Sequence, residues 1–505
     1  MTFSNCLAST ALAGMAALTL NSGVLAQNNP ADFSDQLRDR YTVGTVIERH
    51  TLAERMAAHN VPGMAIAILE DGEVVYAAGF GTARAGSDLP ITADSVFSAG
   101  SVSKIATAAM VLALQAEGRI DIDQPVSTYL TRWALADQPE YDEDQVTLRT
   151  ILSHTAGFNL HGFPDFQPGQ PMPSRIETLN GTGPARQGAL TLLAAPGSGY
   201  RYSGGGYTLA EQVIADRLET GFEEAAQSVL FEPLGMHRTT FANPLPEGHG
   251  DIAYAHGRDG APAALPRGYE AMAELAASGM WTSANDLGAL VVALIESYRS
   301  PDGFLPQDLA TDMMTKVSPS EHGLGPRLSG AGAGLFFHHG GANNSYQTWI
   351  EGHLATGDGL VVLTNGSRGS ALYTEIRNAV ADTMDWEINT PVYLPALNLP
   401  AAQLQSYTGT YAVDADFPRD QREQVINGFF DQGLIVSMQE GELVLAREGS
   451  DQTIELIATA PNRFLITAFN LRDGIAEVEF HRDAFGQSGA MTLHMPNARS
   501  RYERQ

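Results

Sequence analysis

A serine and a lysine stand three residues apart, at Ser101 and Lys104, where an apolar segment begins. Residues 105–114 are Ala, Leu, Ile, Val, Met and Thr, which predicts a buried helix, and Gly118 predicts its end. Residues i and i+3 share one face of a helix, so the hydroxyl and the amine can approach each other. Unpaired N–H groups at a helix start also favour negative charge. The pattern suits a nucleophilic serine.

The scarcity of lysine supports this interpretation. The chain has two lysines, Lys104 and Lys316, among its 30 basic residues. Arginine does not release its proton in a protein, whereas a desolvated lysine can act as a base near neutral pH. The alternative is a helix-capping serine followed by a solvated lysine.

A tyrosine supplies the next candidate group. Tyr202 lies in a glycine-rich turn that leads into a helical segment. Its phenol could share a proton with Lys104 and pass it to a leaving group. Alternatively, Tyr202 is an aromatic side chain packed under a flexible loop.

A histidine followed by two glycines ends an apolar strand near residue 340. Gly340 and Gly341 would let a ligand lie against the backbone, and the N–H of Ala342 could point into the site. The alternative is that His339 merely ends a strand beside a bulge.

The elements around these residues are typical of a mixed α/β domain. We expect a long amphipathic helix over 31–60 and then a hairpin over 64–81 that turns at Asp71-Gly72. Helical patterns over 148–157, 222–236 and 272–296 predict a large helical insertion, 332–352 and 359–367 predict adjacent strands, and 370–386 predicts a closing helix.

The two ends of the chain differ from this central part. An apolar run from Leu7 to Leu20 and small residues at Val24 and Ala26 predict a secretory signal cleaved after Ala26, although its tip lacks Lys and Arg. We therefore expect a periplasmic or secreted protein with no stable membrane insertion after cleavage. The single cysteine, Cys6, lies in this leader, so the mature chain would have no cysteine nucleophile and no disulfide.

After the leader about 480 residues remain, which favours two domains. We expect residues 27–390 to form the first domain and the proline-containing residues 391–400 to form a linker. Residues 401–505 would then form a small β-barrel of seven or eight short strands. The net charge of −28 argues against binding to nucleic acid or anionic lipid. The sequence indicates no cofactor and no metal.

Three motifs together resemble the signatures of the serine β-lactamase and penicillin-binding protein superfamily. These are Ser101-Val102-Ser103-Lys104, Tyr202-Ser203-Gly204 and His339-Gly340-Gly341. The likeness is to the class C β-lactamase-like branch, which includes esterases, D-aminopeptidases and DD-peptidases, and it spans about residues 35–385. Leu152-Ser153-His154-Thr155-Ala156-Gly157 and Gly279-Met280-Trp281-Thr282-Ser283 match accessory motifs, and the Tyr-Thr-Gly-Thr-Tyr at 407 resembles lipocalin-like domains attached to some of these hydrolases.

The resemblance implies an antiparallel sheet flanked by helices, with an all-helical subdomain and a cleft between them. It also implies that Ser101 attacks a carbonyl, that Lys104 and Tyr202 handle the proton, and that the N–H groups of Ser101 and Ala342 form an oxyanion hole. His339, where many relatives carry lysine, would position substrate and add field from one side. The second motif usually ends in asparagine; Gly204 lacks that amide, which favours esters or peptides over β-lactams.

Other classes of function remain open. An α/β-hydrolase would need a Gly-x-Ser-x-Gly elbow, which the chain lacks, and a metallohydrolase would need clustered ligands. A scaffold that binds cell-wall peptides without catalysis is the stronger alternative, but it has no need of a lysine beside a serine. The sequence therefore predicts a serine hydrolase for small ester or peptide substrates, with β-lactamase or DD-peptidase activity as the alternative, and an oligomer is possible.

Overall fold

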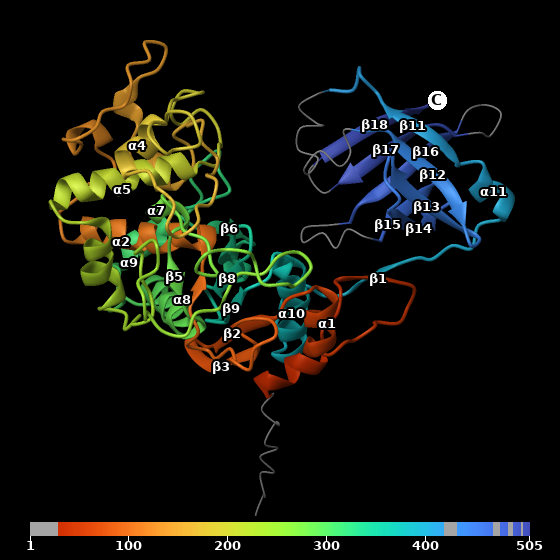
Figure 1. Cartoon of the computed structure of the whole chain (residues 1–505), viewed down its shortest axis with the longest axis horizontal. Coiled ribbons are helices and arrows are strands. Elements are labelled where there is room, and N and C mark those ends of the chain that lie inside the picture. Colours follow the sequence, from red (N-terminus) through yellow and green to blue (C-terminus); the bar gives the residue numbers. More distant parts are fainter. Residues whose placement is uncertain (1–28, 419–431, 468–474, 483–487, 496–497) are drawn as a thin grey trace, which may run out of the picture.

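The computed structural model describes residues 29–418, 432–467, 475–482, 488–495 and 498–505 (Figure 1). The predicted signal at 1–26 lies outside these residues. In the described part of the chain, no helix combines the length and the apolar character needed to cross a bilayer.

A six-stranded antiparallel sheet forms the centre of the first part of the chain. Its strand order is β3-β2-β9-β8-β7-β6. The hairpin predicted over 64–81 is confirmed as β2 and β3, and the strands predicted after residue 332 are confirmed as β7, β8 and β9. The bounds are β2 (Gly63–Glu70), β3 (Glu73–Gly81), β6 (Arg327–Ser329), β7 (Phe336–Ala342), β8 (Gln347–His353) and β9 (Gly359–Thr364).

Successive side chains of strand β2 point to opposite faces of the sheet, and both faces are covered. Met64, Ile66 and Ile68 pack with helix α10 (Gly369–Thr383) and helix α1 (Leu52–Ala58). The alternate residues, including Ala65 and Ala67, join the larger core that contains helix α8 (Ala284–Arg299). The sheet therefore lies between two helical layers, as predicted, and α10 is the expected closing helix.

The prediction of one long helix over 31–60 is wrong. The segment instead forms a short helix η1 (Pro30–Asp35), strand β1 (Tyr41–Val43) and α1. Gly44 has φ of 85°, a left-handed conformation that breaks a helix. Strand β1 pairs in parallel with β10 (Val392–Leu394), so the stretch predicted as a linker contains a strand.

The helical insertion follows the helix that carries Lys104, α2 (Ser103–Ala116), which is preceded by a short turn η2 (Gly100–Val102). The single helix expected over 272–296 is divided, because Ser283 caps a new helix by accepting from the Asp286 N–H. The other elements are β4 (Phe97–Ser98), η3 (Val126–Thr128), η4 (Glu143–Gln145), α3 (Leu148–Leu152), α4 (Arg175–Asn180), α5 (Gly204–Leu218), α6 (Phe222–Ala226), η5 (Gln227–Phe231), α7 (Leu275–Ser278), β5 (Trp281–Thr282), α9 (Gln307–Met313) and η6 (Gly332–Gly334).

The C-terminal part is a closed barrel of eight antiparallel strands in chain order, β11 to β18 (Figure 1). Aromatic side chains fill its interior: Tyr407 stacks on Phe480 with centroids 4.6 Å apart. The predicted barrel is confirmed. Its elements are α11 (Ala401–Gln405), β11 (Gly409–Val413), β12 (Leu434–Gln439), β13 (Glu442–Arg447), β14 (Thr453–Ala460), β15 (Arg463–Ile466), β16 (Glu477–Arg482), β17 (Ser488–Met495) and β18 (Ala498–Arg504).

Candidate active site

Ser101 and Lys104 meet at the start of α2. Ser101 lies in η2, one turn before the apolar body of the helix, and the Nζ of Lys104 donates to its Oγ at 3.3 Å. Lys104 is 2% exposed and also donates to the carbonyl of Ala277 at 2.7 Å. The amine is thus held inside the protein and directed at the serine.

Two tyrosine rings face the Lys104 amine, and their surroundings differ. The Nζ lies 4.9 Å from the ring centre of Tyr202 and 5.5 Å from that of Tyr207. Tyr207 is fully buried, its hydroxyl donates to the Leu152 carbonyl, and burial raises its pKa well above the usual value. Tyr202 lines a cavity with Ser101. Of the two, Tyr202 is the tyrosine that a ligand in this cavity can contact.

The backbone beside Ser101 is in close contact with the end of strand β7. A Cβ on Gly100, which has φ of 51°, would lie 2.7 Å from the Ala342 nitrogen. A Cβ on Gly341 would overlap the Ala99 carbonyl and lie 3.3 Å from the Ser101 nitrogen. The nitrogens of Ser101 and Ala342 are therefore brought together, and Gly341 is needed for the chain's own packing. Gly340 lines the cavity.

His339 also lines this cavity, but as a neutral ring. Its Nδ1 donates to the Gly340 carbonyl at 2.7 Å, so the proton is on Nδ1 and Nε2 carries a lone pair. Burial, together with the charges of His322 and Lys104, holds its pKa well below the usual value. Because the ring is uncharged, it cannot add the positive field expected from the sequence; it offers a hydrogen-bond acceptor.

A second histidine, His154, packs directly on Tyr202. The ring centroids are 4.2 Å apart, and the His154 Nδ1 accepts the Ser203 N–H at 3.1 Å. The His154 carbonyl accepts the Arg201 N–H at 2.8 Å. One residue, His154, therefore binds the backbone on each side of Tyr202 and also packs against its ring. Burial lowers the pKa of His154 well below its ordinary value, so this ring is neutral.

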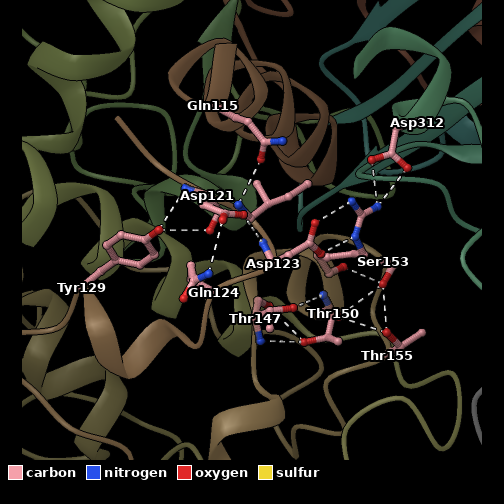
Figure 2. A network of polar contacts seen from close by, with 12 residues as sticks. Gln115, Asp121, Asp123, Gln124, Tyr129, Thr147, Thr150, Ser153, Thr155 and Asp312 are labelled. Carbon is pink, nitrogen blue, oxygen red and sulfur yellow. Dashed lines mark hydrogen bonds and ion pairs between the residues drawn. The ribbon is translucent and has the colours of Figure 1, made fainter. Parts of the chain in front are cut away.

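A polar network fixes the segment that carries His154 (Figure 2). In helix α3, Arg149 forms ion pairs with Asp123 at 2.6 Å and with Asp312 at 2.8 Å. At the end of α3 the hydroxyl of Ser153 donates to the Arg149 carbonyl and contacts the Thr155 hydroxyl at 2.9 Å. The network anchors the turn in which His154 has φ of 60°.

The cavity at Ser101 has a volume of about 460 Å³. Gly204 forms part of its wall, and a Cβ there would lie 3.1 Å from Cε2 of Phe163. The space left by the missing amide is thus partly filled by Phe163. Arg327 contributes a cationic side chain to the cavity.

Carboxylates gather at the same site. Asp165 and Glu274 line the cavity, and Glu270 lies behind them, where it accepts from the Ser345 hydroxyl at 2.5 Å. Burial raises the pKa of Glu274 to about 7 and that of Glu270 to about 7, and the charge of Asp165 adds to both shifts. These groups titrate near neutrality.

Several residues of this site carry no sequence pattern that predicts their role. His154 lies in the accessory motif Leu152-Ser153-His154-Thr155-Ala156-Gly157, and its position before Thr-Ala-Gly is the one sequence signal for it. Asp165, Glu274, His322 and Arg327 have no local sequence signal, because distant segments bring them together. Among the described residues, no group of three or more His, Cys, Asp or Glu side chains is arranged to hold a metal ion.

Two proteins with similar sequences are named as hydrolases. Esterase EstB of Burkholderia gladioli is 28% identical over 63% of this chain and 80% of its own length. A D-aminopeptidase of Gluconobacter oxydans is 28% identical over 37% of this chain and 34% of its own length.

The octameric penicillin-binding protein homologue from Pyrococcus abyssi has the same fold, with a TM-score of 0.57 and 22% identity over 89% of this chain and 98% of its own. The family described as Beta-lactamase matches residues 49–384. This match covers more than half of the chain, which therefore belongs to the β-lactamase family and has the fold of its serine hydrolases.

Proposed function

We propose that the protein hydrolyses esters or amides of small substrates through an acyl-enzyme on Ser101. The observation that carries the proposal is the contact of the buried Lys104 amine with the Ser101 hydroxyl, beside the paired nitrogens of Ser101 and Ala342. A binding scaffold would not need this arrangement.

The proposed reaction has two halves, formation of the acyl-enzyme and its hydrolysis, and Lys104 takes part in both. The Ser101 oxygen attacks the carbonyl carbon while its proton passes to the Lys104 amine, which this step requires in its unprotonated form. The N–H groups of Ser101 and Ala342 receive the negative charge on the carbonyl oxygen. As the bond to the leaving group breaks, Tyr202 relays the proton from Lys104 to that group. Water then attacks the acyl carbon and gives its proton to Lys104, and this proton passes to the Ser101 oxygen as the bond between Ser101 and the acyl group breaks, which releases the acid and frees Ser101.

The geometry favours esters and peptides over β-lactams. A β-lactam carries a carboxylate, and the neutral His339 ring offers it no charge, which leaves Arg327 as the cation of the cavity available to it. The amide that would hold an acylamide side chain is absent at Gly204, and Phe163 occupies part of that space.

The experiment compares hydrolysis of p-nitrophenyl butyrate by the wild type, Ser101→Ala and Ser87→Ala. Ser87 lies in an exposed turn and controls for loss of a hydroxyl. We expect turnover to disappear only in Ser101→Ala. Equal turnover in all three proteins would reject Ser101 as the nucleophile.

We also propose the domain division 27–390, 391–400 and 401–505, cleavage after Ala26, and a periplasmic or secreted location. N-terminal sequencing of the protein recovered from periplasm or medium tests the cleavage and the location. One structural relative is described as octameric, and we propose that this chain can also form an oligomer; light scattering of the purified protein tests this.

A further inference from the structure

The carbonyl that holds the Lys104 amine belongs to α7, a helix of a single turn. Ala277, in α7, accepts from Nζ of Lys104 at 2.7 Å. The neighbouring carbonyl of Ala276 accepts from the Thr107 hydroxyl of α2 at 2.9 Å. Figure 1 shows α7 between α2 and α5, and it packs on both helices. The direction of the Lys104 amine therefore depends on where α7 lies.

A buried carboxylate on α5 holds the start of α7. Glu211 is 1% exposed, and its Oε2 accepts the N–H of Ala276 at 3.1 Å. This N–H lies in the first turn of α7, where a helix offers no acceptor of its own and where a negative charge is favourable. Oε1 of Glu211 accepts from Nη1 of Arg175, also at 3.1 Å. Both carboxylate oxygens thus have donors inside the protein.

The burial of Glu211 has a cost that its contact with α7 helps to offset. Removal from water raises the pKa of Glu211, and the charge of Arg175 and the N–H of Ala276 oppose this effect. A helix as short as α7 has little stability of its own, so its position is set by such contacts. Ala277 lines the cavity at Ser101, whereas Glu211 does not. Any influence of Glu211 on the cavity therefore passes through α7.

We propose that Glu211 is a positioning residue for Lys104, which it keeps directed at Ser101 by fixing the start of α7. This inference rests on the proposed function, in which Lys104 takes the proton of Ser101, and it adds a residue to that function. Without Glu211 the Ala277 carbonyl is free to shift, and the Lys104 amine moves with its acceptor. Because the amine lies 3.3 Å from the Ser101 Oγ, a small displacement lengthens this contact and slows acylation.

The test measures how fast a fluorophosphonate labels Ser101 in the full-length protein. Two quantities are determined: the maximal labelling rate, and the reagent concentration that gives half of that rate. Glu211→Leu removes both acceptors, and we expect the maximal rate to fall by about tenfold or more while the half-rate concentration changes by less than about twofold. Glu211→Gln retains one oxygen for the Ala276 N–H, so we expect it to recover most of the rate.

Glu375→Leu is the matched control. Glu375 is also 1% exposed and pairs with an arginine, Arg55, but it lies on α10, on the other side of the central sheet. We expect this variant to unfold at a lower temperature and to keep its labelling rate. If either Leu variant does not fold, its arginine partner is also replaced, by Arg175→Met or Arg55→Met, because an apolar pair is tolerated better than one unpaired buried charge.

A double-mutant cycle shows whether the effect passes through Lys104. Glu211→Leu is combined with Lys104→Arg, and the labelling rate is compared with that of Lys104→Arg alone. Arginine does not accept the proton, so α7 has no base left to position, and we expect Glu211→Leu to change this slower rate by less than about twofold. The same loss with and without Lys104→Arg would mean that Glu211 does not act through Lys104, and would overturn the inference.

The outcomes separate the inference from the proposed function. Labelling at the wild-type rate in a folded variant that lacks Glu211, or an equal loss of rate in the Glu375→Leu control, would overturn the inference and leave the proposed function standing. If the wild type is not labelled on Ser101 and does not hydrolyse p-nitrophenyl butyrate, the proposed function fails and the inference fails with it.

Discussion

The ring of His154 lies against the ring of Tyr202, with centroids 4.2 Å apart and planes inclined by 31°. We therefore expect His154 to act on the proposed reaction through Tyr202, as a positioning residue. It also accepts the Ser203 N–H, so ring packing and backbone anchoring come from the same side chain.

Two substitutions separate these tasks. His154→Asn tolerates the left-handed backbone and retains an acceptor for Ser203, but it removes the ring. We expect kcat to fall about tenfold with little change in KM, because Tyr202 loses its support. His154→Phe keeps the ring, leaves the Ser203 N–H unpaired and strains the left-handed backbone at this position, so we expect a loss of at least about 1–3 kcal/mol in stability with kcat retained. Steady-state kinetics and thermal unfolding measure both; full kcat in the Asn variant would show that the ring contact does not matter.

Lys104→Arg tests the base. Arginine keeps the positive charge but does not give up its proton, so acylation should slow by at least about a hundredfold. The matched control is Lys316→Arg, because Lys316 is the chain's other lysine and pairs with Glu321 on the surface. Stopped-flow measurement of nitrophenol release gives the acylation rate. Equal rates in both variants would remove Lys104 from the mechanism.

Gly204→Asn alone should not create β-lactamase activity. Its Cβ would lie 3.1 Å from Phe163 and 3.2 Å from the His161 carbonyl, so the new amide displaces its neighbour. The double variant with Phe163→Ala provides room, and we expect cephalosporin turnover to rise only in that protein. Nitrocefin hydrolysis reports the result, and a gain in the single variant would show that Phe163 is no obstacle.

Glu270 should make the fold less stable as pH rises. Burial raises its pKa from 4.5 to about 7, so the folded protein holds this proton more tightly than the unfolded chain. The stabilisation is complete below pH 4.5 and is lost as the pH rises through 7, by about 3 kcal/mol at most. Between pH 5 and pH 8 the Tm of Glu270→Gln should therefore fall less than that of the wild type. Parallel Tm curves would mean that Glu270 ionises freely.

Local patterns predicted the elements whose partners are close in sequence. The hairpin over 64–81 is an example, because Asp71-Gly72 determines the turn and the flanking apolar runs pair directly. The segment 31–60 was misjudged because β1 finds its partner at 392–394, far along the chain, and because Gly44 interrupts the apolar spacing.

The residues of the candidate site likewise divide into those whose contact follows from their spacing in the sequence and those that only the fold brings together. Ser101 and Lys104 are three residues apart, so helix geometry alone predicts their contact. The charge state of His339 depends on burial by segments from elsewhere in the sequence, which is why the expected field is absent. Asp165 and Glu274 come together only through the fold of the insertion.

The most direct test of an activated Ser101 is the intact mass of the full-length protein after incubation with a fluorophosphonate, followed by peptide mapping. We expect one adduct per chain, located on Ser101 and absent from Ser101→Ala. No adduct on the folded protein, or an adduct on a different residue, would contradict an activated Ser101.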